Sequence, residues 1–214
     1  MKRVLCYGDS LTAGYHSQPK GYSPYGQHLL SASVAVDIIG LSGFTTKNML
    51  DSVNYQENED CFEQITKGLC VQCREHEYDA ICLLAGTNDI GEGENSSRII
   101  HNIDALVQLC LEHTFRVFLC TIPAMGAEAA EPELTNVRNE VNEGIVEITK
   151  ANSDQVVIID SSALLPQAEL IGLCGERSCT GTPIWDADGL HLSPQGSKVL
   201  GEHIKQVIST FTVI

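Results

Sequence analysis

The chain has 214 residues, of which 43% are hydrophobic and 19% are charged, a composition typical of a globular protein rather than a disordered or fibrous one. Thirteen basic against 28 acidic residues give a net charge of −15, which disfavours nucleic acid and anionic lipid surfaces as partners. The longest apolar runs, such as residues 81–85, are far shorter than the ~20 residues that cross a bilayer. No signal-peptide pattern follows Lys2 and Arg3, so we expect a cytoplasmic protein.

Short apolar runs alternate with helical patterns along the chain. Residues 3–7, 34–40, 80–85, 116–122 and 156–160 are nearly continuous in apolar residues, as in parallel strands covered on both faces. Helical periodicity marks residues 25–32, 61–76, 98–112, 134–150 and 194–210. The alternation predicts an α/β fold with a five-stranded, mainly parallel sheet between helical layers. No repeat or linker interrupts it, so we expect a single domain over residues 1–214.

Nine cysteines are an odd and rather high number. Those in the predicted strands read as small buried hydrophobes. The C-x-x-C of residues 70–73 lies in a predicted helix and follows no strand, unlike a thioredoxin-like motif. Cys174 and Cys179 either pair with each other or join residues 70–73 around zinc, although no histidine stands at ligand spacing. The odd count favours a reducing compartment, and we expect no metal.

Polar groups follow the carboxyl ends of the predicted strands, where the ligand site of a doubly wound sheet lies. The first loop opens with Gly8-Asp9-Ser10-Leu11. Ser10 is either a helix N-cap or a nucleophile at a strand-to-helix turn, although the motif is not the G-x-S-x-G elbow. Gly43, in the second loop, either forms an ordinary tight turn or brings a backbone amide close to a ligand.

The third and fourth loops carry an amide and an acid–base pair. Asn88, in Gly86-Thr87-Asn88-Asp89, either stabilises a turn or donates to an oxyanion. Asp188 and His191 are three residues apart before the last helix. At that spacing the carboxylate can accept the Nδ1–H of the imidazole and leave Nε2 free as a base. The alternative is an exposed histidine beside a helix start.

Together and in this order, the four blocks resemble the SGNH hydrolases, the GDSL esterase/lipase family. The resemblance spans residue 4 to about residue 200. The opening residues 4–12 are most similar to the small arylesterase and acyltransferase-like members. The resemblance implies the three-layer α/β/α, flavodoxin-like fold of this family, which agrees with the strand and helix pattern.

The resemblance also implies a role for each matched residue. Ser10 is the expected nucleophile, His191 the base, and Asp188 the acid that orients the base. The amides of Ser10 and Gly43 and the side chain of Asn88 are the expected oxyanion hole. No metal and no organic cofactor has a part in such a mechanism.

The expected reaction is hydrolysis of short-chain acyl esters through an acyl-enzyme on Ser10. Tyr15 and Trp185 lie near the motifs and are candidate contacts for a small-molecule ester, or simply packed loop residues. Within the family, acyl transfer and lysophospholipase or thioesterase activity are alternatives. A metal-dependent phosphoesterase and a non-catalytic ester- or glycan-binding relative are rival classes, and the sequence leaves the oligomeric state open.

Overall fold

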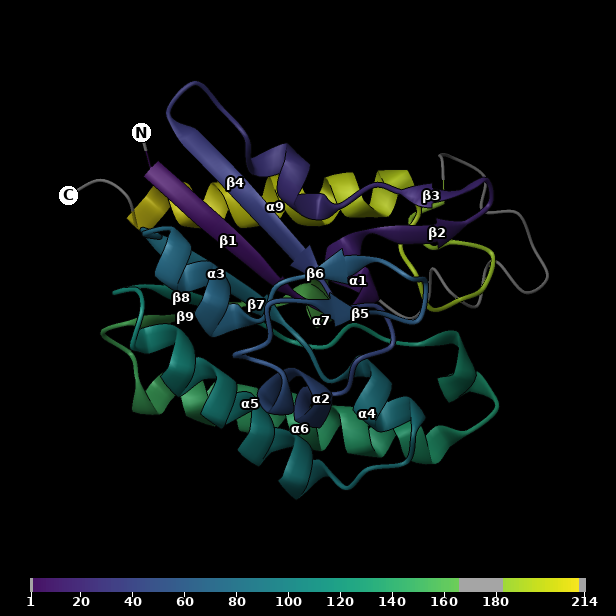
Figure 1. Cartoon of the computed structure of the whole chain (residues 1–214). Helices are drawn as coiled ribbons and strands as arrows, with labels where there is room; N and C mark the ends of the chain where they lie inside the picture. The colour runs from purple at the N-terminus through teal and green to yellow at the C-terminus, as the bar shows by residue number, and fades with distance from the viewer. Residues whose placement is uncertain (1, 166–182, 212–214) are drawn as a thin grey trace.

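The computed structural model describes residues 2–165 and 183–211, and a five-stranded sheet lies at its centre (Figure 1). The strands are β1 (Lys2–Gly8), β4 (Val34–Gly40), β7 (Ala80–Leu84), β8 (Val117–Cys120) and β9 (Val156–Ile159). Their order in the sheet is β4-β1-β7-β8-β9, and all neighbouring pairs are parallel. The predicted fold class and all five predicted strands are confirmed.

Successive residues of each central strand point into two different cores. In β1, Leu5 and Tyr7 belong to one buried cluster, whereas Val4 and Cys6 belong to the other. Side chains alternate in this way along any strand, and both faces are apolar here because both are covered. This explains why the strands read as continuous apolar runs in the sequence.

Helices cover the two faces of the sheet (Figure 1). The cluster of Leu5 and Tyr7 includes residues of α2 (Thr46–Asp51), α3 (Leu69–Glu75), α5 (Ser96–Leu111) and α6 (Pro132–Ala151). The cluster of Val4 and Cys6 includes residues of the 3₁₀ helix η1 (Tyr25–Leu29) and of α9 (Pro194–Phe211). The result is a three-layer arrangement.

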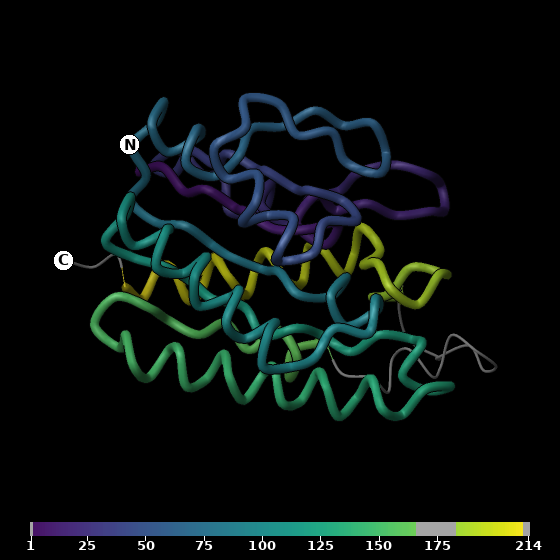
Figure 2. Tube along the Cα trace, turned by 60° about the horizontal axis from the view of Figure 1, so that its bottom comes forward, coloured from purple at the N-terminus to yellow at the C-terminus, as the bar shows by residue number. Residues whose placement is uncertain are grey.

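The helix predicted over residues 61–76 is wrong in its first half. Only α3 is helical there, and β6 (Ile65–Thr66) instead pairs antiparallel with β5 (Asn58–Glu59). The Asp60 carboxylate accepts hydrogen bonds from the backbone amides of Phe62 and Gln64, which stabilises a turn in place of a helix. A second small hairpin joins β2 (Tyr15–Ser17) to β3 (Lys20–Tyr22), and the two hairpins lie side by side in Figures 1 and 2.

The remaining short elements lie mostly at the carboxyl ends of the strands. They are α1 (Ser10–Ala13), α4 (Thr87–Gly91), α7 (Ser161–Leu164) and the 3₁₀ helix η2 (Gly126–Ala129). The seven cysteines of the described residues are free thiols, and Cys174 and Cys179 lie outside those residues. No helix within residues 2–165 and 183–211 is both long and apolar enough to cross a membrane.

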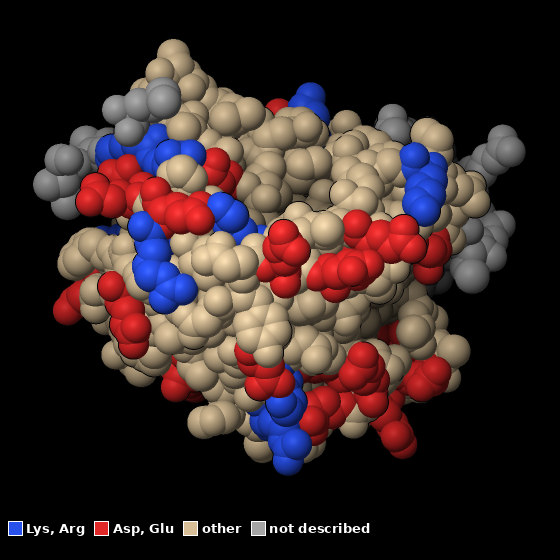
Figure 3. All heavy atoms as spheres, viewed as in Figure 1, with Lys and Arg blue, Asp and Glu red and all other residues tan. Residues whose placement is uncertain are grey.

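Acidic side chains mark the surface of the molecule. In the view of Figure 3, Asp and Glu side chains form several groups over the surface, with Lys and Arg side chains among them. A buried exception is Glu128, which pairs with Arg138 at 2.8 Å between Oε1 and Nε. This pair ties the loop after β8 to α6.

Candidate active site

Ser10 is placed by a sharp turn at the end of β1. A Cβ atom at Gly8 would collide with the backbone oxygen of Leu84 on the neighbouring strand, so glycine is required there. Asp9 is the N-cap of α1, and its Oδ1 accepts from the Leu11 amide at 2.9 Å. Ser10 is thus the first residue of a short helix at the sheet edge, and only 6% of it is exposed.

The structure brings Ser10, His191 and Asp188 together. His191 Nε2 lies 2.9 Å from Ser10 Oγ, and His191 Nδ1 lies 2.7 Å from Asp188 Oδ2. The backbone amides of Leu190 and His191 both donate to Asp188 Oδ1 at 2.9 Å. The three side chains form a chain of hydrogen bonds in which the imidazole stands between a hydroxyl and a carboxylate, the arrangement that activates a serine.

Hydrogen bonds keep Asp188 ionised. Partial burial acts to raise its pKa, but the His191 side chain and the amides of His191 and Leu190 outweigh it and lower the pKa to about 2. The carboxylate is therefore charged at neutral pH. It fixes the proton of His191 on Nδ1 and leaves Nε2 facing Ser10 as an acceptor.

The turn that carries Asp188 and His191 is closed by its own backbone and tied to two other segments. The Asp186 amide donates to the His191 carbonyl at 2.8 Å. The side chain of Asp186 accepts from the amide and the hydroxyl of Ser17, at 2.5 and 2.6 Å. The Gly126 amide donates to the Gly189 carbonyl at 2.6 Å. Asp186 was not predicted as a site residue, and its partner Ser17 is too distant in sequence to suggest the contact.

Gly43 and Asn88 follow the strands on either side of β1. Gly8 pairs with Gly40 of β4 and with Leu84 of β7, so the loops carrying Gly43, Ser10 and Asn88 leave one edge of the sheet in adjacent rows. Gly43 has a φ of 79°, in the left-handed region that favours glycine. The predicted oxyanion donors therefore lie on neighbouring loops.

A network of hydrogen bonds joins the loop of Gly43 to the loop of Asn88. Asn88 Nδ2 donates to the Phe44 carbonyl at 2.9 Å. The buried Asp89 carboxylate accepts from the amide and the hydroxyl of Thr46, at 2.8 and 2.5 Å. Asn102 Nδ2 donates to the Thr46 hydroxyl at 3.0 Å. These bonds set the position of the Gly43 loop relative to Asn88.

Asp9 is a titratable group beside the predicted nucleophile that sequence reasoning did not assign. It is fully buried, and burial raises its pKa to about 6, against the lowering effects of the Leu11 amide and of the nearby His191 side chain. Its place in Gly8-Asp9-Ser10, directly before the predicted nucleophile, is the signal that could have found it. The raised pKa itself depends on packing that the sequence does not display.

The two candidate substrate contacts have different positions. The ring of Tyr15 lies edge-on to the imidazole of His191, with centroids 4.9 Å apart and planes at 75°. Phe62, which sequence reasoning missed, stacks on Tyr15 at 4.2 Å. Trp185 is only 1% exposed and packs in the core on the α9 side of the sheet. The structure therefore does not support a contact between Trp185 and a substrate, because its ring is covered by core residues.

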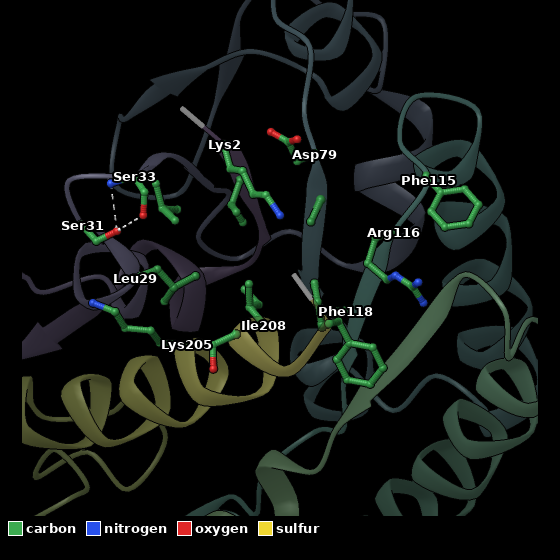
Figure 4. A pocket seen from close by; sticks show the side chains of 15 residues that line it. Lys2, Leu29, Ser31, Ser33, Asp79, Phe115, Arg116, Phe118, Lys205 and Ile208 are labelled. Atoms are coloured by element: carbon green, nitrogen blue, oxygen red, sulfur yellow. Dashed lines mark hydrogen bonds between the residues drawn. The ribbon is translucent and has the colours of Figure 1, made fainter. Parts of the chain in front are cut away.

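Two cavities lie in different parts of the molecule. One of about 470 Å³ opens beside Gly43 and is also lined by Phe44, Tyr55 and Cys61. Another of about 630 Å³ lies at the amino ends of the strands, between β1, β8 and α9 (Figure 4). The first is the one next to the predicted oxyanion loop. Within the described ranges no group of three or more His, Cys, Asp or Glu side chains is placed to hold a metal ion.

Three solved structures of similar fold are named as a lipase/acylhydrolase or as esterases. A lipase/acylhydrolase from Enterococcus faecalis has a TM-score of 0.70 and 22% identity, covering 99% of this chain and 97% of the other. An inhibitor-bound aryl esterase from M. smegmatis has a TM-score of 0.67 and 16% identity, covering 98% and 99%. An acetyl xylan esterase has a TM-score of 0.66 and 15% identity, covering 96% and 99%. At these identities the likeness shows the fold.

The family is shown by the sequence itself. No curated protein matches this chain. The model of the GDSL-like lipase/acylhydrolase family matches residues 6–199, a range that contains Ser10, Gly43, Asn88, Asp188 and His191. With four motif blocks in order and a matching fold, the chain belongs to the GDSL-like lipase/acylhydrolase family.

Proposed function

We propose that this hydrolase is a serine esterase that cleaves short-chain acyl esters through an acyl-enzyme on Ser10. One observation carries the proposal: the unbroken hydrogen-bond chain from Asp188 Oδ2 through His191 to Ser10 Oγ, with steps of 2.7 and 2.9 Å. A serine hydroxyl is a weak nucleophile at its ordinary pKa and needs an adjacent base. His191 supplies that base, and Asp188 supplies the charge that stabilises the imidazolium formed when the proton moves.

In the first half of the reaction, Ser10 Oγ attacks the ester carbonyl carbon while His191 Nε2 takes the hydroxyl proton. The negative charge that develops on the carbonyl oxygen is stabilised by the amides of Ser10 and Gly43 and by the Asn88 side chain. One of the two Nδ2 protons of Asn88 is used by the Phe44 carbonyl, which leaves the other for the oxyanion. Such a donor is worth about 3–4 kcal/mol in the transition state.

The first half ends when His191 gives the proton to the oxygen of the leaving alcohol, which departs and leaves the acyl group on Ser10. A water molecule then loses a proton to His191 and attacks the acyl carbonyl, and the released Ser10 takes the proton back. Every proton therefore passes through Nε2 of one imidazole. Asp188 accepts the Nδ1–H throughout and does not itself take a proton.

The loops around the site support a short acyl group. The loops after β1, β7 and β8 consist largely of polar, acidic or small residues. The loop after β8 is also fixed by the buried Glu128–Arg138 pair and by the Gly126–Gly189 backbone bond. Such loops offer little apolar surface to a long chain, whose burial would otherwise contribute about 0.8 kcal/mol per CH₂.

A series of p-nitrophenyl esters from acetate to decanoate, assayed below micelle-forming concentrations, tests the proposal. We expect kcat/KM to be highest for acyl groups of two to four carbons and to fall for longer chains. The Ser10→Ala variant should be inactive on all of them. A maximum at octanoate or longer would assign the protein to lipase-like or thioesterase-like chemistry, and turnover that survives in Ser10→Ala would contradict the mechanism.

A further inference from the structure

The hairpin of β5 and β6 lies against the predicted oxyanion loop, although its sequence gave no functional signal. The Cys61 amide donates to the Ser42 carbonyl at 3.2 Å, and Asp60 Oδ2 accepts from the Ser42 amide at 3.1 Å. A Cβ atom built on Gly43 would lie 3.0 Å from Cys61 Sγ. The hairpin therefore binds both the amide and the carbonyl of Ser42, the residue just before Gly43.

The buried carboxylate of Asp60 sets the position of Phe62, two residues further along the chain. Asp60 is 5% exposed, and its Oδ1 accepts from the amides of Phe62 and Gln64 at 2.8 and 2.9 Å. Because its Oδ2 binds Ser42, the same side chain holds both the oxyanion loop and the turn that carries Phe62. Phe62 is thus fixed relative to the site and is not an ordinary surface residue.

An aromatic contact runs from Phe62 to the catalytic base proposed above. The rings of Phe62 and Tyr15 are stacked, with centroids 4.2 Å apart and planes at 16°. Tyr15 in turn lies edge-on to His191 at 4.9 Å. Lys20 Nζ lies 5.6 Å from the centroid of Phe62. Both aromatic side chains are only half-buried, so they leave apolar surface exposed beside His191, which is typical of a ligand site.

The position of this surface indicates which part of an ester it contacts. His191 protonates the leaving oxygen in the proposed reaction, so the alcohol must lie next to the imidazole. Tyr15 is the ring that contacts this imidazole. We propose that Phe62 and Tyr15 form the wall that binds the alcohol part of the ester, and that Phe62 selects alcohols that carry a ring over small aliphatic ones. This inference rests on the proposed esterase function.

Two kinds of alcohol share the required chemistry, a ring with an apolar face or edge. One is a phenol, and the other is a sugar, whose C–H groups pack on aromatic side chains. Aromatic contacts are typically worth enough to change affinity by about two- to tenfold. Acetate esters of ethanol, phenol and methyl xyloside therefore distinguish a ring from no ring, and an aryl ring from a sugar ring, at constant acyl group.

The test compares Phe62→Ala, Phe62→Tyr and the control Phe115→Ala on these three acetates. Phe115 is 66% exposed and lines the cavity at the amino ends of the strands, far from Ser10 in the fold. Phe62→Ala should raise KM about fivefold for at least one of the two ring-bearing esters, with kcat within twofold and KM for ethyl acetate nearly unchanged. Phe62→Tyr should restore KM, and Phe115→Ala should leave every constant unchanged.

Three results would overturn the inference. An equal rise of KM on all three acetates would mean that Phe62 only supports the fold. A fall in kcat at constant KM would mean that it acts on the position of His191. A change that follows the acyl group of a phenyl ester series, and not the alcohol, would place the wall on the acyl side.

A binding measurement separates this inference from the proposed reaction. Phenol and methyl xyloside are titrated by NMR against the wild-type protein and Phe62→Ala, with ethanol as the comparison. Binding of a ring compound that is lost in Phe62→Ala supports the wall even if no ester is hydrolysed, a result that would contradict the esterase proposal alone. Equal binding to both proteins would contradict the wall while leaving the esterase proposal intact.

Discussion

Two carboxyl groups flank the Ser10–His191 pair, and their surroundings move their pKa values in opposite directions. Asp188 accepts several hydrogen bonds, which lower its pKa to about 2, whereas burial of Asp9 raises its pKa to about 6. The interactions of Asp188 stabilise the folded state above pH ~4, its ordinary range, and this contribution is lost as the pH falls toward 2. Asp9 instead titrates in mildly acidic solution.

Substitution of the three hydrogen-bonded residues tests their proposed roles. Ser10→Ala and His191→Ala should each lower kcat by at least about a thousandfold, because nucleophile and base act as a unit. Asp188→Asn should retain more activity, since orienting the imidazole is a smaller demand than moving its proton. Steady-state kinetics and labelling by a fluorophosphonate probe measure the activity that each of the three variants retains. Residual turnover of Ser10→Ala within tenfold of wild type is incompatible with the nucleophile assignment.

Asp9→Asn should stabilise the protein at neutral pH. The folded-state pKa of about 6 is above the ordinary 3.8, so the folded state binds more protons between these values and the free energy of unfolding falls as the pH rises through them. The difference corresponds to about 3 kcal/mol at pH 7. Asparagine keeps an acceptor for the Leu11 amide without the charge.

Thermal or urea unfolding from pH 3.5 to pH 8 measures this effect of Asp9. The wild type and Asp9→Asn should differ little at the acidic end, and the variant should gain on the wild type until about pH 6. Asp51→Asn, on the exposed surface, is the control and should show no such gain. A constant difference between Asp9→Asn and wild type at every pH would show that the carboxyl is not titrating.

At the scale of whole elements, what the sequence predicts depends on how local the cause is. The central strands are predictable because each is a nearly continuous run of apolar residues. The helices α5 and α6 are predictable because their buried residues recur at helical spacing. The hairpin of β5 and β6 is not predictable in this way, because its turn depends on Asp60, which also binds the distant Ser42. The local periodicity of the sequence carries no information about the contact between Asp60 and Ser42.

The candidate site follows the same division. The motifs predict the candidate site residues Ser10, Gly43, Asn88, Asp188 and His191, and the parallel sheet explains why the loops of the first three leave one edge. The motifs do not indicate Phe62 and Asp186, because each contacts a partner that is far away in the chain. Trp185 was placed at the site by its neighbours in sequence, but the structure buries it.

The bonds between the Gly43 loop and α4 should matter to turnover more than to binding. In Asp89→Asn one acceptor becomes an amide donor facing the Thr46 hydroxyl, which already accepts from Asn102. We expect kcat to fall about tenfold with KM within about twofold, because the Gly43 amide, a proposed oxyanion donor, shifts away from its position. Asp104→Asn, on the exposed side of α5, is the control.

Binding of a boronic acid, which mimics the tetrahedral intermediate, provides the second readout for Asp89→Asn. Its affinity should weaken by the same factor as kcat, since both depend on the oxyanion donors. An Asp89→Asn protein with wild-type kcat and a lower melting temperature would show that the network serves stability only.

At the scale of the whole molecule, we expect the net negative charge of the protein to favour neutral esters over anionic ones. A net charge of −15, with groups of Asp and Glu side chains on the face seen in Figure 3, repels anions over about one Debye length. Between about 0.02 and 0.5 M salt, kcat/KM should rise several-fold for phenyl hydrogen succinate and stay level for neutral phenyl butyrate. The same response for both esters would rule out long-range repulsion as the cause.

The bond between Ser10 and His191 joins positions 181 residues apart, and its consequence concerns time during synthesis. In a growing chain Ser10, the proposed nucleophile, is made before β4 and β7, the two strands that flank β1 in the sheet. The imidazole of His191 is made only after the five strands of the central sheet. The proposed esterase activity on a chromogenic ester added to a translation reaction should therefore appear only after the turn of Asp188 and His191 has been made and His191 has reached Ser10.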